Sequence, residues 1–315
     1  MSFKSLRPHL STVLKGMAMG AADIVPGVSG GTIAFITGIY ERLLKALKSC
    51  TPMALLLLKT QGVAAFWRHI DGTFLLSLFG GVITSIALFS HLISAALEQY
   101  PLQVWGFFFG LIITSAVYLA KTIDLIHWRP LLLIVLGAAA AVVFASIKPV
   151  DVPVNVVTVF LSGAIAICAM ILPGVSGSFL LLVMGMYSVM INAVTEGNFV
   201  LLGVFFAGCV FGLLAFSHLL HWLLQRFHQS TIAVLTGFLF GAAVVVWPWK
   251  HVLQTQLNRH GEEVVAVQEN VWPWVYESLN GQNPQLLSVM LLALVGALLM
   301  LFVEWVAKIG RNRPL

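Results

Sequence analysis

The sequence predicts an all-α polytopic membrane protein built from two inverted-topology repeats, each a re-entrant helical hairpin followed by three transmembrane helices. Three observations support this prediction. The 315-residue chain is 59% hydrophobic and only 9% charged. Several apolar runs are long enough to cross a hydrocarbon layer of ~30 Å. One short motif also interrupts the apolar sequence twice, at matching places in the two halves.

The two motif copies are the strongest local signal. Pro-Gly-Val-Ser-Gly-Gly-Thr occupies residues 26–32, and Pro-Gly-Val-Ser-Gly-Ser occupies residues 173–178, an offset of 147. Proline and glycine break a membrane helix, and hydrocarbon offers no water to the freed backbone groups. Such backbone survives at membrane depth where protein buries it or where it lines a cavity, so we expect a hairpin tip at each motif. A packing break, with glycines for close helix approach, is the alternative.

The first repeat is expected to occupy residues 1–150. The arms of its hairpin run from Thr12 to Ile24 and from Ile33 to Tyr40, and each has about ten residues, roughly half of a span. Residues 41–71 mix Lys and Arg with Leu, Met, Phe and Trp, which predicts one or two amphipathic helices at the membrane surface. Three spans are expected at 73–97, 102–120 and 130–147.

The second repeat is expected to occupy residues 151–315 in the same order. Its hairpin arms are predicted at 156–172 and 179–190. Its three spans are predicted at 199–224, 231–247 and 286–307. Residues 250–285 form the one long polar segment.

Matched residues outside the motifs support the repeat. The pairs at the offset of 147 are Gly16 with Gly163, Gly38 with Gly185 and Tyr40 with Tyr187. Phe-Ser-His-Leu at 89–92 recurs at 216–219, an offset of 127. The difference of 20 residues is the surface segment after the first hairpin, which the second half lacks.

Each half has three spans, an odd number, so the second half enters the membrane upside down. With the N-terminus in the cytoplasm, 14 of the 17 Lys and Arg fall in cytoplasmic segments, as the positive-inside rule expects. Lys148, Lys250 and Arg259 stay outside. We therefore predict a multi-pass protein with both termini in the cytoplasm and with its two hairpin tips meeting near the membrane midplane.

The tips offer hydrogen-bond donors for an anion. A half-helix that begins at a tip presents unpaired N–H groups and the positive end of its dipole. Glycines let an anion approach these amides and hydroxyls add donors, an arrangement that binds phosphate. The candidate phosphate-binding residues are Ser29, Gly30, Gly31, Thr32, Ser176, Gly177 and Ser178. The alternative is that Ser29 and Ser176 only cap their half-helices, which stabilises each by ~1 kcal/mol.

Titratable residues in apolar segments are candidates for coupling and gating. Asp23 lies deep in the first hairpin, where an acid is costly, which suggests proton or ion coupling; a structural bond to tip amides is the alternative. His91 and His218 hold matched positions near span ends, which suggests gating or pH sensing, or packing retained by the symmetry. Glu304, near the end of the last span, is expected at the membrane interface.

The sequence lacks the motifs that are typical of several other functional classes. The three cysteines have no Cys-x-x-Cys spacing and no ligand-like neighbours, so we predict no disulfide framework and no metal site. There is no Walker motif, no nucleophile elbow and no basic face for nucleic acid. No cofactor and no nucleic-acid partner are expected.

The first motif, together with Gly-Ala-Ala-Asp-Ile-Val at 20–25 and the second copy of the motif, resembles the PopT family of polyprenyl-phosphate transporters. The resemblance covers nearly the whole chain, from about Lys15 to the last span. It implies a translocase of the bacterial cytoplasmic (inner) membrane, not an enzyme. Its substrate would be undecaprenyl phosphate, the carrier lipid of peptidoglycan and surface-glycan synthesis, returned from the outer to the inner leaflet. The coupling ion, a proton or another, and a homo-oligomeric state stay open.

An intramembrane enzyme is the main alternative. The undecaprenyl pyrophosphate phosphatase family also has inverted repeats with re-entrant hairpins, and its similar Pro-Gly-x-Ser motif is followed by Arg-Ser. Here Gly30-Gly31 and Gly177-Ser178 take those places, and Asp23 has no acidic neighbour. Phosphoryl chemistry is difficult without a cation to stabilise the developing charge. A small-anion transporter on the same scaffold is a further alternative.

Overall fold

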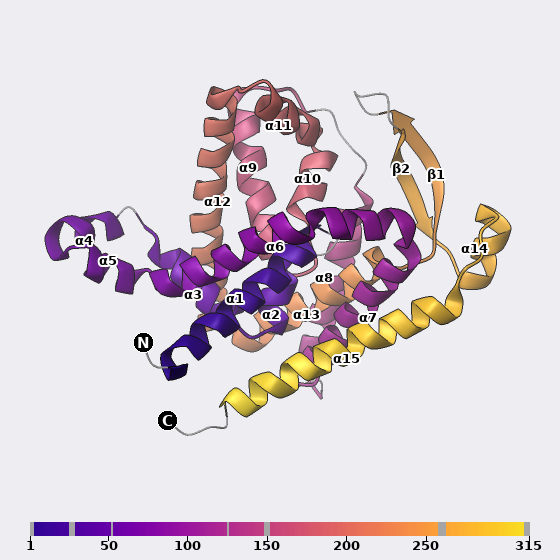
Figure 1. Ribbon diagram of the computed structural model, residues 1–315, viewed down its shortest axis with the longest axis horizontal. Coiled ribbons are helices and arrows are strands. Elements are labelled where there is room, and N and C mark those ends of the chain that lie inside the picture. The colour runs from indigo at the N-terminus through magenta and orange to yellow at the C-terminus, as the bar shows by residue number, and fades with distance from the viewer. Residues whose placement is uncertain are drawn as a thin grey trace.

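The computed structural model describes residues 3–24, 29–51, 53–124, 126–147, 152–257 and 263–311, and it is almost entirely helical (Figure 1). The predicted class of α-helical membrane protein is confirmed, because six of the described helices are long and apolar enough to cross a membrane. They are α6 (Gly72–Gln99), α7 (Pro101–Ala120), α8 (Trp128–Ser146), α12 (Phe199–Arg226), α13 (His228–Val245) and α15 (Leu286–Arg311). Every predicted span coincides with one of these helices.

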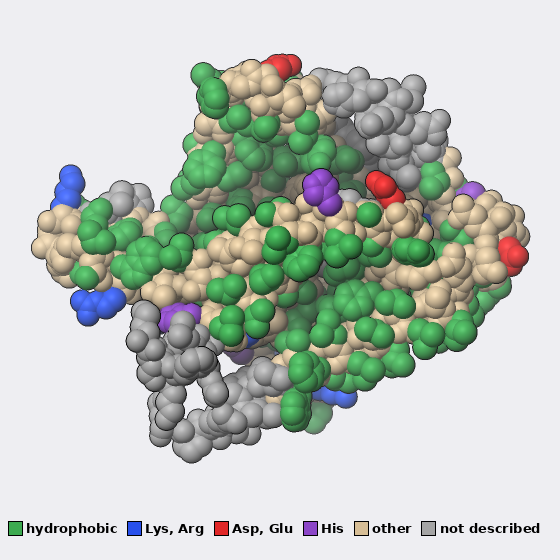
Figure 2. Space-filling view, viewed as in Figure 1, with side chains coloured by type: hydrophobic (Ala, Val, Ile, Leu, Met, Phe, Trp, Pro, Cys, Tyr) green, Lys and Arg blue, Asp and Glu red, His purple; other side chains and the backbone are tan. Residues whose placement is uncertain are grey.

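The outer surface of these helices is apolar. Figure 2 shows large hydrophobic side chains over α6, α12 and α15, with charged groups mainly toward the edges of the view. On α15, Leu287, Met290, Leu294 and Leu298 are each more than half exposed. Soluble proteins rarely expose a continuous apolar surface of this kind, whereas lipid chains cover it at no cost.

The first hairpin consists of three helices rather than two arms. They are α1 (Phe3–Ile24), α2 (Gly30–Ile36) and α3 (Tyr40–Ser49). The predicted second arm, 33–40, breaks after Ile36, because Gly38 takes a left-handed φ of 70° and α3 then starts at Tyr40. The first arm is also longer than the ten residues expected, since the polar residues before Thr12 continue the helix.

The second hairpin is divided in the same way. Its helices are α9 (Val156–Ile171), α10 (Gly177–Val183) and α11 (Met186–Thr195). The predicted arm 179–190 is broken at Gly185, whose φ is 66°, and α10 and α11 meet at an angle of 103°. Such a bend is typical of a re-entrant hairpin or a broken span.

Element lengths and glycine contacts support an internal repeat. The helices α2 and α10 both have 7 residues, α3 and α11 both have 10, and α6 and α12 both have 28. Gly16 of α1 lies against the Leu78 carbonyl of α6, and Gly163 of α9 lies against the Phe205 carbonyl of α12. The two glycines are 147 residues apart and the two residues that they contact are 127 apart, the same offsets as in the sequence repeat. The boundary at residue 150 and the inverted orientation of the halves stay predictions.

Two helix pairs join the two halves. Helix α7 packs on α15, and α8 packs on α13, so each of these pairs joins a helix of one half to a helix of the other. Gly110 of α7 faces the Ala293 carbonyl, and Gly237 of α13 faces the Ile134 carbonyl, in both cases too closely for a Cβ. Gly110 and Gly237 are again related by the offset of 127.

The extra surface segment of the first half contains two short helices. They are α4 (Ala54–Gln61) and α5 (Val63–His69), which project at the left of Figure 1. Arg42 of α3 donates two hydrogen bonds, of 2.7 and 3.1 Å, to Asp71 at the start of α6. This ion pair ties the base of the segment to the hairpin. Residues 41–71, where one or two amphipathic helices are predicted, contain most of α3 together with α4 and α5, and their place at the membrane surface stays a prediction.

The polar segment 250–285 contains structure that the sequence pattern does not predict. The strands β1 (Lys250–Leu257) and β2 (Glu263–Asn270) pair antiparallel, with Lys250 opposite Asn270, and α14 (Pro273–Asn280) follows them. The indole N–H of Trp249 donates to the Pro284 carbonyl at 2.8 Å. This bond ties the base of the hairpin to the segment before α15, and Asn270 Nδ2 of β2 donates to the Val244 carbonyl at the end of α13, at 2.7 Å.

Alanine at the inter-half glycines should destabilise the protein. A Cβ at Gly110 or Gly237 would collide with backbone, and overpacking of this kind costs ~1–3 kcal/mol. Gly80 and Gly203 lie in open space on α6 and α12, so alanine there should be neutral or stabilising by up to ~1 kcal/mol. Thermal unfolding in detergent measures all four variants. Equal melting temperatures for the two sets would contradict the close packing.

Candidate functional site

The two hairpin tips are in direct contact, as the repeat predicts. The Ser29 hydroxyl donates to the Met170 carbonyl at 2.8 Å, and the Gly174 N–H donates to Thr32 Oγ1 at 2.8 Å. Gly31 packs on the end of α9, where a Cβ would lie 2.7 Å from the Met170 carbonyl oxygen. Residues 26–28 of the first motif lie outside the described residues, so these contacts define the described part of the first tip.

The polar groups of the first tip are bonded to one another. Gly30 N–H donates to Asp23 Oδ1 at 2.6 Å, Gly31 N–H donates to Ser29 Oγ at 3.1 Å, and Thr32 N–H donates to the Ser29 carbonyl at 2.9 Å. Ser29 is therefore the N-cap of α2, and Asp23 holds the first amide of that helix. The Ser29 and Thr32 residues are 1% and 0% exposed. In this conformation an anion would have to displace these bonds to reach the first tip.

Two charges of α1 lie at the two ends of α2. Asp23 accepts from the N-terminal amide of Gly30, and the Lys15 ammonium donates to the Thr37 carbonyl at the C-terminus, at 2.8 Å. A negative group at the start and a positive group at the end both complement the helix dipole. Their structural role is therefore clear, because a 7-residue helix is too short to be stable by itself.

The second tip is more open. Ser176 caps α10 by accepting a hydrogen bond from the Phe179 N–H at 3.4 Å, and its hydroxyl lies 2.9 Å from that of Ser178. Ser176 is half-buried and Ser178 is exposed. Gly174 takes a φ of 86°, which only glycine adopts without strain. The hydroxyls of the second tip, unlike those of the first, are accessible to a ligand.

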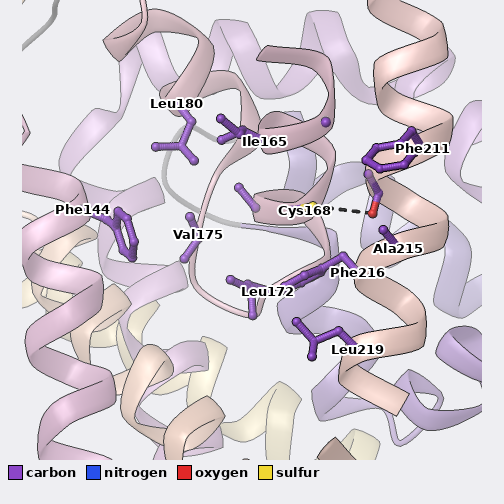
Figure 3. Close-up of a pocket in the computed structure, with 13 residues that line it drawn as sticks. Phe144, Ile165, Cys168, Leu172, Val175, Leu180, Phe211, Ala215, Phe216 and Leu219 are labelled. Carbon is purple, nitrogen blue, oxygen red and sulfur yellow. Dashed lines mark hydrogen bonds between the residues drawn. The ribbon is translucent and has the colours of Figure 1, made fainter. Parts of the chain in front are cut away.

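Two neighbouring cavities adjoin the second tip. The smaller, of about 170 Å³, lies between Ser176, Trp105 of α7, Lys250 of β1 and Gln268 of β2. The larger, of about 450 Å³, is formed by α8, α9, α10 and α12 and is lined by apolar side chains (Figure 3). Both cavities share lining residues, which are Phe144, Val175 and Leu180. The smaller cavity therefore places the polar side chains of Ser176, Lys250 and Gln268 next to a larger cavity with an apolar lining.

The sequence pattern assigns Lys250 only to the outer polar segment. Its place beside Ser176 depends on the β-hairpin, which the motifs do not indicate. The one signal in the sequence is that Lys250 follows the predicted span 231–247 after only two residues. Lone lysines at span ends usually extend to the interface, so this signal is weak.

The two candidate histidines lie away from the tips. His91 is exposed on α6, and His218 Nδ1 lies 2.8 Å from the Leu214 carbonyl on its own helix. Glu304 was expected at the interface, but it is buried at 6% exposure and accepts a hydrogen bond from the Tyr118 hydroxyl of α7. The hydroxyl partner allows this carboxylate to be buried between α7 and α15.

Comparison with known proteins identifies relatives. The profile of the VCA0040-like family, described as undecaprenyl phosphate translocase-like, matches residues 19–264. The chain is 47% identical over 300 residues to the polyprenyl-phosphate transporter of Vibrio cholerae serotype O1 (strain ATCC 39315 / El Tor Inaba N16961), covering 95% of this chain and 97% of that protein. It is 31% identical over 266 residues to the polyprenyl-phosphate transporter of Staphylococcus aureus (strain NCTC 8325 / PS 47), covering 75% and 85%. No solved structure gives a significant match.

Removal of the Thr32 hydroxyl should weaken the contact between the tips. Thr32→Val leaves the Gly174 N–H without its acceptor, and an unsatisfied amide costs ~1–3 kcal/mol. Thr32→Ser keeps the hydroxyl and should cost less. Thr84→Val is the matched control, since this exposed threonine bonds only to its own helix at Gly80. Thermal unfolding in detergent should rank the variants in this order, and an unchanged melting temperature for Thr32→Val would refute the role of the bond.

Proposed function

The chain belongs to the undecaprenyl phosphate translocase-like family, and on that premise we propose that it carries undecaprenyl phosphate from the outer to the inner leaflet of the bacterial cytoplasmic membrane. The returned lipid serves again as the carrier in cell-wall and surface-glycan synthesis. The observation that supports this most directly is the contact of the two tips beside two neighbouring cavities, of which the smaller contains Ser176 and Lys250 and the larger is lined by apolar side chains. A lipid monophosphate needs both kinds of surface.

The phosphate head group is proposed to bind between the tips. The second tip provides the accessible hydroxyls of Ser176 and Ser178 together with the backbone at Gly177. In the first tip, the hydroxyls of Ser29 and Thr32 become available when the hydrogen bonds between the tips open. The amides of Gly30 and Gly31 become available only when their bonds to Asp23 and Ser29 also open. Opening the two bonds between the tips costs roughly 1–3 kcal/mol in total, which is compatible with a gate that opens during transport.

Transport rather than hydrolysis is proposed. Among the described residues at the tips, Asp23 is the one carboxylate, and it already holds the Gly30 amide. A phosphatase needs a positioned nucleophile or activated water and a general acid for the leaving group, so several residues must act together. The first tip instead uses its polar groups to hold itself together.

The same arrangement suggests how transport could be coupled and oriented. Asp23 accepts a hydrogen bond from the Gly30 amide at the first tip, so gain of a proton would weaken this bond and help release the tip. The distribution of Lys and Arg favours cytoplasmic termini. The second tip and its cavities then face the outer side, where the lipid to be returned starts.

A liposome assay tests the proposed function. Purified protein is reconstituted into liposomes that hold undecaprenyl phosphate, and a membrane-impermeant phosphatase is added outside. The accessible fraction should rise from about half toward all of the lipid, without phosphate release by the protein alone. Protein-free liposomes are the control. Accessibility at the protein-free level, with and without an imposed proton gradient, would refute translocation, and phosphate release by the protein alone would indicate an enzyme.

The substitution Asp23→Asn should distinguish proton coupling by Asp23 from its structural bond to the Gly30 amide. Asparagine keeps an oxygen to accept from Gly30 N–H but cannot take up a proton, so the melting temperature should change little while the response of transport to a proton gradient disappears. Glu196→Gln, at an exposed loop position, is the matched control. If Asp23→Asn responds to the gradient as the wild-type protein does, Asp23 has only its structural role.

A further inference from the structure

Lys250 is a cation held in place beside the second tip. Its ammonium donates to the Val245 carbonyl at 2.7 Å and lies 4.8 Å from the centre of the Trp105 ring. Its backbone is fixed by pairing with Asn270 and by a hydrogen bond of 3.0 Å from Asn280 Nδ2 to its carbonyl. The side chain lines the same small cavity as Ser176. Lys250 is therefore held at the small cavity rather than extended into water.

The charge of Lys250 has no carboxylate partner among the described residues. An ammonium group has three donors, and one of them is used by Val245. Burial lowers the pKa of Lys250 to about 8, because desolvation disfavours the charged form. The titratable groups of the neighbouring elements are His251 of β1, Glu269 of β2, and Tyr276 and Glu277 of α14, and none of these forms an ion pair with Lys250 in the described part of the chain. An anion in the small cavity would supply the missing partner.

The larger cavity suits the rest of a lipid. Its lining side chains are apolar, and it meets the small cavity at Phe144, Val175 and Leu180. At its edge, Ile165, Phe211 and Leu219 are 45%, 59% and 47% exposed. Exposed apolar side chains at the edge of this cavity would allow lipid to reach it from the side. Figure 3 shows the lining side chains on α8, α9, α10 and α12.

We propose that Lys250 and the Ser176–Ser178 tip bind the phosphate of a polyprenyl phosphate, and that the groove between α9, α10 and α12 binds the first part of its isoprenoid tail. The inference rests on the proposed function and adds the site at which the lipid enters. Charge complementarity and the three lining residues common to the two cavities select this occupant. A neutral lipid would leave the ammonium unpaired, and a free phosphate would leave the groove empty.

Binding by the full-length protein in nanodiscs tests the head-group half of the site. The probes are undecaprenyl phosphate and undecaprenol, which differ only in the phosphate. Lys250→Gln should weaken binding of the phosphate at least about tenfold and leave undecaprenol unchanged, because a buried charge partner is lost. Lys250→Arg keeps the charge and should retain most of the affinity. Lys59→Gln, an exposed lysine on α4, is the matched control. Wild-type affinity for the phosphate in folded Lys250→Gln would overturn the assignment.

Tryptophan in the groove tests the tail half. Ala215 lines the groove on α12, so Ala215→Trp should fill it and weaken binding of both lipids by at least about tenfold. Val210→Trp adds the same side chain to the same helix at a position that does not line the groove. Equal binding by the two tryptophan variants would overturn the tail site.

Proton uptake gives a readout that a structural role of Lys250 would not affect. Burial lowers the pKa of Lys250 to about 8, so near pH 8.5 a substantial share of the free protein has neutral Lys250. A bound anion raises this pKa, so lipid binding should take up protons, whereas Lys250→Arg stays charged throughout and should take up none. Calorimetry in two buffers of different ionisation enthalpy measures the difference. Equal proton uptake by wild-type and Lys250→Arg protein would contradict the proposal.

The binding and transport assays distinguish a wrong site from a wrong function. If wild-type protein binds undecaprenyl phosphate through Lys250 but does not raise its accessibility in liposomes, the site stands and the transport function falls. If wild-type protein transports the lipid and Lys250→Gln binds it as tightly as before, the function stands and the site falls.

Discussion

The constraint on which this structure depends is that hydrocarbon offers no hydrogen bonds to a broken helix. Each motif stops a helix inside the apolar part of the chain, which frees backbone groups that need partners. The tips provide these partners for each other. The Ser29 hydroxyl donates to the Met170 carbonyl, and the Thr32 hydroxyl oxygen accepts from the Gly174 N–H. The two halves therefore stabilise each other at the point where each would be unstable alone. The Ser and Thr of the first motif have this role in addition to any contact with a ligand.

The two tips are unequal, although their motifs are nearly the same. In the first half, the charges of Lys15 and Asp23 hold both ends of α2, and all seven residues of that helix are buried. The second half has Ser162 and Met170 at the corresponding positions, so α10 has no such charges, and most of its residues are at least partly exposed. The second tip is consequently the accessible one, and both cavities lie beside it.

The sequence predicted the features that depend on local chemistry and missed those that depend on tertiary packing. Apolar runs predicted the six spans, and the Pro-Gly motifs predicted two tips that meet. The breaks at Gly38 and Gly185 were missed because an isolated glycine does not by itself end a helix in a hydropathy pattern. The β-hairpin was missed because its strands lie in a polar segment without a strong alternating pattern. Since this hairpin positions Lys250, the cation beside Ser176 could not be found from spacing alone.

The packing also indicates which element moves at the lowest cost. Helices α7 and α15, and likewise α8 and α13, join the two halves through glycines that face backbone carbonyls with no space for a Cβ. Sliding one half past the other would separate these close-packed surfaces, and it would also break both hydrogen bonds between the tips. Helix α10 differs, because it is short, partly exposed and joined at Gly174 and Gly185, two residues with left-handed φ. If a head group binds beside Ser176 as proposed, movement of α10 would act through Gly174 on its hydrogen bond to Thr32, one of the two that join the tips.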